Sequence, residues 1–138
     1  MGQIRKYLDA SLIINVFSPV EELARRSLAI VNDAGLQFIV SDYLELETLP
    51  KMRFNKKHDQ VEFTEALFRK SEYVNSSDEI VAKAKELASM YGLAAMDALH
   101  AASAIAAGAD EFLTFEKSTK PLFRIPVAEL QVVSLHGE

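Results

Sequence analysis

Residues 4–17 read IRKYLDASLIINVF, and the apolar pattern of this stretch changes at a single aspartate. The segment Ile4–Leu8 has the length of a strand, and the apolar run Ala10–Phe17, directly after Asp9, is predicted to be a short helix. Further strands are predicted at 37–40, 73–74, 111–115 and 130–135. Strands that alternate with helices are typical of a mostly parallel sheet covered on both faces. The sequence therefore predicts a single α/β domain over residues 1–138.

Turn and capping residues delimit the helices between these strands. Ser18-Pro19-Val20-Glu21 has the form of a capping box with proline at the first helical position, and it opens a helix that ends near Gly35. Ser41 is the predicted N-cap of a helix that runs to about Pro50. Further helices are predicted at 61–70, from a second capping box at 76–79 to Gly92, and over the alanine-rich segment 93–109, whereas 121–126 is predicted to be a loop.

The composition excludes several classes of protein. With 49% apolar and 25% charged residues the chain is an ordinary globular protein, and the absence of cysteine excludes thiolate nucleophiles, thiolate metal sites and iron–sulfur clusters. A net charge of −5 argues against strong non-specific binding of nucleic acid, although a local basic patch remains compatible with it. Asp9 argues against a secretory signal, and Asp97 argues against a membrane span at 93–109. We therefore expect a cytoplasmic protein that does not bind a membrane.

Four carboxylates lie in apolar settings or next to predicted strand ends. Asp9 and Glu116 each follow a strand, Glu47 lies on the helix after the second strand, and Asp97 lies within an alanine-rich helix. In an open α/β sheet, ligands bind beyond the carboxyl ends of the strands. Burying unpaired carboxylates together is costly, and a divalent cation such as Mg²⁺ or Mn²⁺ offsets that cost because it prefers oxygen ligands. The joint placement of the four acids therefore predicts a metal site.

Each acid also has an ordinary explanation when it is taken alone. Asp9 and Asp97 have positions suited to helix N-caps, and Glu47 has the position of a solvated helical residue. Glu116 precedes Lys117, so the two residues have the spacing of an ordinary turn pair.

The sequence lacks the motifs of other common chemistries. It contains no GxSxG, Walker A or GxGxxG pattern. The histidines, His58, His100 and His136, are scattered and lack paired ligand spacing. We expect His100 to be a satisfied core or surface histidine, with support of a metal ligand as the alternative. An aspartyl-phosphate hydrolase would need a second aspartate where Ser11 stands.

Four blocks of the chain, in their order and spacing, resemble the PIN-domain family. They are Tyr7-Leu8-Asp9-Ala10-Ser11, Val40-Ser41 with Glu47, Met96-Asp97-Ala98-Leu99-His100-Ala101-Ala102, and Phe112-Leu113-Thr114-Phe115-Glu116-Lys117. The resemblance spans nearly the whole chain, and the third block is the most specific. The best-known members of this family are the VapC-like ribonuclease toxins of bacterial toxin–antitoxin pairs.

The resemblance implies a three-layer α/β/α sandwich with a mostly parallel central sheet. It also implies an acidic cluster that holds one or two Mg²⁺ or Mn²⁺ ions and hydrolyses RNA phosphodiester bonds by metal-activated water. Asp9, Glu47 and Asp97 match the first three catalytic, metal-binding acids, and Ser11 matches a hydroxyl residue that supports the first. Glu116 matches the fourth acid, where the family usually has an aspartate that is shorter by one methylene.

The resemblance further implies a protein antitoxin and a homodimer as partners. The basic run Lys51, Arg53, Lys56 and Lys57 is the candidate RNA-binding surface, with Lys120 and Arg124 as further candidates and a solvated loop as the ordinary explanation. Two other functions remain open: a PIN-fold module with weak or no catalysis that binds RNA or a protein, and a DNA-directed nuclease of the same fold.

Overall fold

The structure is a computed structural model that describes residues 3–137, so residues 1, 2 and 138 of the predicted domain lie outside it. Its centre is a sheet of five strands in the order β3-β2-β1-β4-β5, and every neighbouring pair is parallel. The strands are β1 (Ile4–Leu8), β2 (Leu36–Ser41), β3 (Glu72–Val74), β4 (Glu111–Thr114) and β5 (Val132–Ser134). The predicted α/β class is confirmed.

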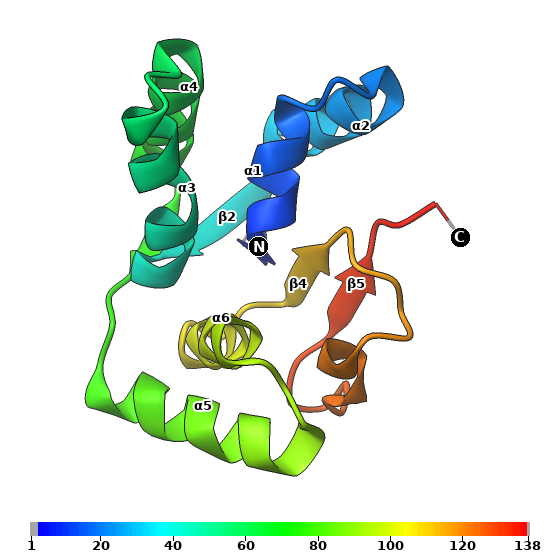
Figure 1. The fold of residues 1–138 in the computed structure, drawn as a ribbon. Coiled ribbons are helices and arrows are strands. Elements are labelled where there is room, and N and C mark those ends of the chain that lie inside the picture. Colours follow the sequence, from blue (N-terminus) through cyan, green and yellow to red (C-terminus); the bar gives the residue numbers. More distant parts are fainter. Residues whose placement is uncertain (1–2, 138) are drawn as a thin grey trace.

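Helices cover both faces of this sheet, which confirms the three-layer arrangement. They are α1 (Ala10–Val16), α2 (Glu21–Val31), α3 (Asp42–Phe54), α4 (His58–Arg69), α5 (Asp78–Tyr91) and α6 (Ala95–Ala106), with a short 3₁₀ helix, η1 (Pro121–Arg124), in the segment predicted as a loop. Helices α5 and α6 lie on one side of the strands, and α1 to α4 lie on the other (Figure 1).

Successive side chains along the central strands point to opposite faces of the sheet. Tyr7 on β1 is buried against α5 and α6, whereas the next residue, Leu8, is buried against α1 and α3. Phe112 and Leu113 on β4 alternate in the same way. Each such side chain contributes about 1.5–3 kcal/mol to stability by leaving water. No helix within residues 3–137 combines the length and apolar character needed to span a membrane.

Helix α3 continues through the proline at which the sequence predicted its end. Pro50 lies inside the helix, which ends at Phe54. A proline removes one backbone hydrogen bond, but Leu49 and Met52, on either side of it, remain buried and hold the helix against the core. The consequence for the site is that Lys51 belongs to the last turns of a helix and not to a loop.

The boundaries of three other helices differ from the prediction. Helix α2 begins after Val20, because the Ser18 hydroxyl accepts a hydrogen bond from the Val20 amide at 3.0 Å in place of capping the helix, and it ends at Val31. Ser77, and not the preceding serine, caps α5 by accepting from the Ile80 amide at 3.2 Å. Helix α4 begins three residues earlier than predicted, at His58.

The topology brings the four acids to one edge of the sheet. Strand β1 lies in the middle, and the chain moves from it to β2 on one side and later to β4 on the other, so the two halves of the sheet diverge from β1. Asp9 follows β1 and Glu116 follows β4 at the carboxyl ends of parallel strands. Helix α3, with Glu47, begins at this edge, and so does α6, with Asp97, because α6 must return to the start of β4 at the opposite edge.

Candidate functional site

Asp9 lies between the last residue of β1 and the first residue of α1. Its Oδ1 accepts a hydrogen bond from the Ala10 amide at 2.9 Å, so its predicted role as a helix N-cap is confirmed. Its Oδ2 accepts from the Ser11 hydroxyl at 2.9 Å and from the Thr114 hydroxyl at 2.7 Å. The half-buried carboxylate is therefore held in one orientation by donors from two elements.

Asp97 lies in the first turn of α6, three residues after the N-cap Ala94, so the explanation of Asp97 as a cap is wrong. Burial raises the pKa of the Asp97 carboxyl, the charges of Asp9 and Glu47 raise it further, and His100 opposes them. Within residues 3–137 no hydrogen bond reaches this carboxylate. Its ionised form is thus poorly stabilised by the protein alone.

Glu116 lies two residues beyond β4. Its amide donates to the Thr114 hydroxyl at 3.1 Å, and its carbonyl accepts from the Ser134 hydroxyl at 2.6 Å, so the backbone here is fixed. Burial raises the pKa of the Glu116 carboxyl, as do the charges of Asp97 and Asp9, while Lys120 lowers it. In the described part of the chain, no ion pair joins Glu116 to the lysine that follows it, so the turn-pair explanation is wrong.

Glu47 lies on the outer side of α3 with 34% of its side chain exposed, and it contacts a buried histidine. Its Oε1 is hydrogen-bonded to Nε2 of His100. The other ring nitrogen, Nδ1, lies 2.6 Å from the Tyr7 hydroxyl, which lies 2.6 Å from the Ser41 hydroxyl. His100 is therefore a satisfied core histidine, as expected, and it also contacts a candidate acid.

The four candidate acids have the right chemistry to bind a hard divalent cation, but their side chains are not arranged around a common point. All four candidate side chains are carboxylates. The charge of Asp9 raises the pKa values of Asp97 and Glu116, and the charge of Asp97 raises that of Glu116 as well. Among the residues that the structure describes, however, no three of them converge in an arrangement ready to bind a metal ion. A bound cation would have to draw the carboxylate oxygens together.

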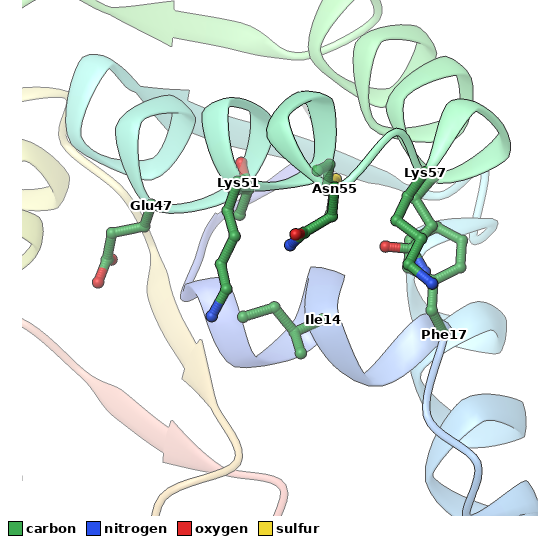
Figure 2. Close-up of a pocket in the computed structure, with 9 residues that line it drawn as sticks. Ile14, Phe17, Glu47, Lys51, Asn55 and Lys57 are labelled. Carbon is green, nitrogen blue, oxygen red and sulfur yellow. The ribbon is translucent and has the colours of Figure 1, made fainter.

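A pocket of about 250 Å³, which Glu47 lines, lies between α1, α3 and the start of α4 (Figure 2). Glu47 and Lys51 lie one turn apart on α3, and Lys51 points from α3 toward Ile14 of α1 (Figure 2). Lys57 lines the same pocket near Phe17. Two of the four predicted RNA-binding cations, Lys51 and Lys57, therefore line the same pocket as Glu47.

The other predicted cations are placed differently. Arg53 lines another hollow and forms an ion pair with Glu65 of α4 at 3.0 Å. Lys56 is exposed in the turn after α3 and has a left-handed φ of 56°. Arg124 donates to the Tyr91 carbonyl at 2.9 Å, so part of its bonding capacity is used inside the fold.

Sequence reasoning missed two residues that hold the acids or their neighbours in place, Thr114 and Tyr7. Thr114 could not be linked to Asp9 without the strand register, which pairs Leu8 with Leu113 across 105 residues of chain. Tyr7 was predicted only as part of a strand. Its alternation pattern indicates which face it occupies, but nothing local in the sequence indicates that its hydroxyl meets His100.

Fold and site together define an α/β protein with an acidic edge at the point where its parallel sheet divides. The chain belongs to the PIN domain family, whose pattern matches residues 6–121. The resemblance predicted from the sequence is thereby confirmed. Members of this family are in general nuclease-like and depend on divalent metals.

Several solved structures share the fold. A chain of a toxin–antitoxin complex from Klebsiella pneumoniae is 23% identical, with a TM-score of 0.68 over 94% of this chain and 96% of that chain. A chain of VapBC2 from Rickettsia felis, bound to a DNA fragment from its promoter, is 18% identical, with a TM-score of 0.67 over 95% and 98%. A chain of VapBC-1 from nontypeable Haemophilus influenzae is 15% identical, with a TM-score of 0.66 over 95% and 98%. A comparison with curated protein sequences finds no match.

Proposed function

We propose that the protein is a metal-dependent endoribonuclease that hydrolyses RNA phosphodiester bonds and is the toxin of a toxin–antitoxin pair. One observation carries the proposal: acids from separate elements lie at one edge of the sheet, and the charge of one raises the pKa of another. The pKa values of Asp97 and Glu116 are both raised by burial and by the charge of Asp9. Such crowding of negative charge is costly unless a cation balances it.

In this proposal Asp9 and Asp97 hold a Mg²⁺ or Mn²⁺ ion together with Glu47 and Glu116. When bound, such an ion lowers the pKa of its water and offsets the charge that builds on the phosphate during hydrolysis. Ser11 and Thr114 occupy one oxygen of Asp9 and so fix the direction of its carboxylate. Because these two hydroxyls already orient the carboxylate, Asp9 needs little rearrangement to bind the ion.

Positive charge for the RNA backbone must be local, because the whole chain carries a net charge of −5. Lys51 and Lys57 supply it in the pocket that begins at Glu47. Neither lysine forms an ion pair with another described residue, so both are available to phosphates. An RNA strand that crosses this pocket would place a phosphate next to Glu47. An RNA substrate also agrees with a cytoplasmic location.

A protein antitoxin is the proposed partner, because the structures that share the fold are toxin–antitoxin complexes by their descriptions. The surface offers apolar side chains for such a contact. Ile14 of α1 is 53% exposed, and Leu46 and Phe54 of α3 are 65% and 85% exposed. The same kind of surface suits the homodimer that the family resemblance implies.

The test is cleavage of a panel of labelled structured RNAs by the purified protein with Mg²⁺ or Mn²⁺. We expect cleavage that stops in EDTA and is lost in Asp9→Asn, whereas Glu62→Gln, a control at an exposed carboxylate of α4, cleaves like the wild type. Binding of RNA without any metal-dependent cleavage would contradict the proposal and favour a binding module. Cleavage of DNA alone would favour a DNA-directed nuclease.

A further inference from the structure

We propose that His100 is a positioning residue that fixes the orientation of the Glu47 carboxylate, and that Tyr7 and Ser41 hold His100 for this task. The inference rests on the metal-dependent function proposed above and deepens it, because it says how an acid on an exposed helix face is made ready for the ion. Without support, a glutamate side chain on a helix surface samples several rotamers, and ordering it costs conformational entropy.

The hydrogen bond to His100 restricts the rotamers of Glu47 by holding one of its carboxylate oxygens. Oε1 is bonded to Nε2 of His100, which is only 1% exposed. Within the described residues Oε2 forms no hydrogen bond and no ion pair. The carboxylate thus has one oxygen held by the protein and the other free to face an ion.

The donors and acceptors along this chain of contacts have one consistent assignment when Glu47 is ionised and His100 is neutral. The carboxylate can only accept, so Nε2 of His100 carries the proton and Nδ1 must accept from the Tyr7 hydroxyl. The Tyr7 oxygen then accepts from the Ser41 hydroxyl, whose own oxygen accepts from the Leu44 amide at 3.2 Å. Every polar atom on this path has a partner, as buried groups require.

Packing holds the path rigid. The Tyr7 ring stacks on Phe112 with centroids 5.2 Å apart, and the His100 ring meets Tyr7 edge-on at 5.7 Å. Tyr7 is fully buried on the central strand, and burial raises the pKa of its hydroxyl well above the usual range, so it remains a hydrogen-bond donor. The path starts at Ser41, the N-cap of α3, and returns to α3 at Glu47. It therefore fixes the helix that carries Glu47 at two points.

Helix α6 combines two tasks in this arrangement. Asp97 and His100 are three residues apart and lie on one face of the helix. One residue is a candidate metal ligand, and the other supports a ligand on a different helix.

The test compares His100→Gln with His100→Asn by calorimetric titration of the full chain with Mn²⁺. Glutamine places an amide nitrogen where Nε2 lies and can still donate to Glu47, whereas the shorter asparagine reaches only Tyr7. We expect His100→Asn to bind Mn²⁺ about 10- to 100-fold more weakly, as changes around metal ligands usually do. His100→Gln should retain most of the affinity of the wild type. Melting in EDTA reports the stability of both variants separately.

A double-mutant cycle makes the assignment specific. In a Glu47→Gln background, His100→Asn should cause no further loss of Mn²⁺ affinity, because the two residues act through one contact. Equal losses for glutamine and asparagine at position 100, or an undiminished loss in the Glu47→Gln background, would overturn the positioning role and leave the metal-dependent function standing. A wild type that binds no Mn²⁺ would overturn both.

Tyr7→Phe provides a variant that should keep the fold. It removes only the hydroxyl and retains the ring that stacks on Phe112. We expect a weaker Mn²⁺ affinity than in the wild type and a smaller loss than in His100→Asn. An affinity equal to that of the wild type would show that Tyr7 does not hold His100 for this purpose.

Discussion

At the scale of single residues, neighbouring groups give the acids of this edge different properties. Asp9 accepts three hydrogen bonds, which hold its carboxylate in one orientation. Asp97 is half-buried next to other acids, and its pKa is raised by burial and by the charge of Asp9. A bound cation would therefore favour the ionised form of Asp97. Replacing Asp97 should remove activity while it leaves the fold stable.

We predict that Asp97→Asn abolishes cleavage and is more stable than the wild type in EDTA at pH 7. Folding raises the pKa of Asp97, so its charged form costs stability above the folded pKa, and the cost vanishes below the unfolded value of about 3.9. The gain in Tm should be small, because even 1 kcal/mol shifts Tm by only about 4 °C in a domain of this size. It should shrink as the pH falls toward 4. A large drop in the Tm of Asp97→Asn would identify Asp97 as a structural residue.

We predict a weaker effect at Glu116. Its longer side chain reaches an ion by folding back or through a bridging water, which Mg²⁺ readily retains. Glu116→Gln should therefore lower Mn²⁺ affinity less than Asp97→Asn does and still slow cleavage, and Glu116→Asp should remain active. Calorimetric titration and cleavage assays of these variants decide the point. If Glu116→Gln equals the wild type in both, the acidic site is a triad.

The acids themselves could be predicted from sequence, and most of their supporting residues could not. Asp9 and Asp97 are conspicuous because each interrupts an apolar stretch. Thr114 and Tyr7 contribute through contacts that span 105 and 93 residues of chain. Such contacts depend on strand register and on which face a side chain occupies, and local patterns do not encode their partners.

At the scale of elements, α3 links the acids to the substrate surface. The helix places Glu47 and Lys51 on the face of the pocket, and it places Arg53 on another side, where Glu65 neutralises it. The sequence predicts the basic run, a candidate RNA-binding surface, to follow the end of the helix, because Pro50 indicates that the helix ends there. The burial of Leu49 and Met52 outweighs the hydrogen bond that the proline removes, and this balance cannot be read from the proline alone.

We predict that Lys51→Ala weakens RNA binding and lowers the slope of log affinity against log salt by about 0.7, the value for one phosphate contact on a single strand. Arg53→Ala is the matched control, since it removes the same charge from the same helix but breaks an ion pair with Glu65. The measurement uses the Asp9→Asn background, in which RNA is bound and not cut. Equal slope changes for both variants would show a general effect of charge and no contact at Lys51.

At the scale of the whole molecule, the strand order determines where the site lies. The strand order of the parallel sheet changes direction at β1, and the site lies at the carboxyl ends of the strands there. Both the fold class and this location follow from the alternation of strands and helices in the sequence. The sequence could not show how closely the four carboxylates approach, because that depends on packing between α3, α6 and the sheet. In the structure the acids are near enough for the charge of one to change the pKa of another. Among the described residues, however, no three of them are arranged to bind one metal ion.

We predict that Mn²⁺ stabilises the folded protein, because the ion binds the native state and not the unfolded chain. At a free concentration 100 times its Kd, the gain in the free energy of unfolding should be about 2.7 kcal/mol. The gain should be small in Asp9→Asn and unchanged in the Glu62→Gln control. An equal shift of Tm in all three proteins would indicate binding elsewhere on the surface.

The most direct test of the central claim is an anomalous difference map from crystals grown with Mn²⁺. The ion should appear at the carboxyl ends of β1 and β4, within about 2.5 Å of carboxylate oxygens of both Asp9 and Asp97. Glu47 should approach the ion through Oε2 while Oε1 stays on His100. A map with no peak between Asp9 and Asp97 at millimolar Mn²⁺, or with its main peak away from this edge, would contradict the proposed metal site.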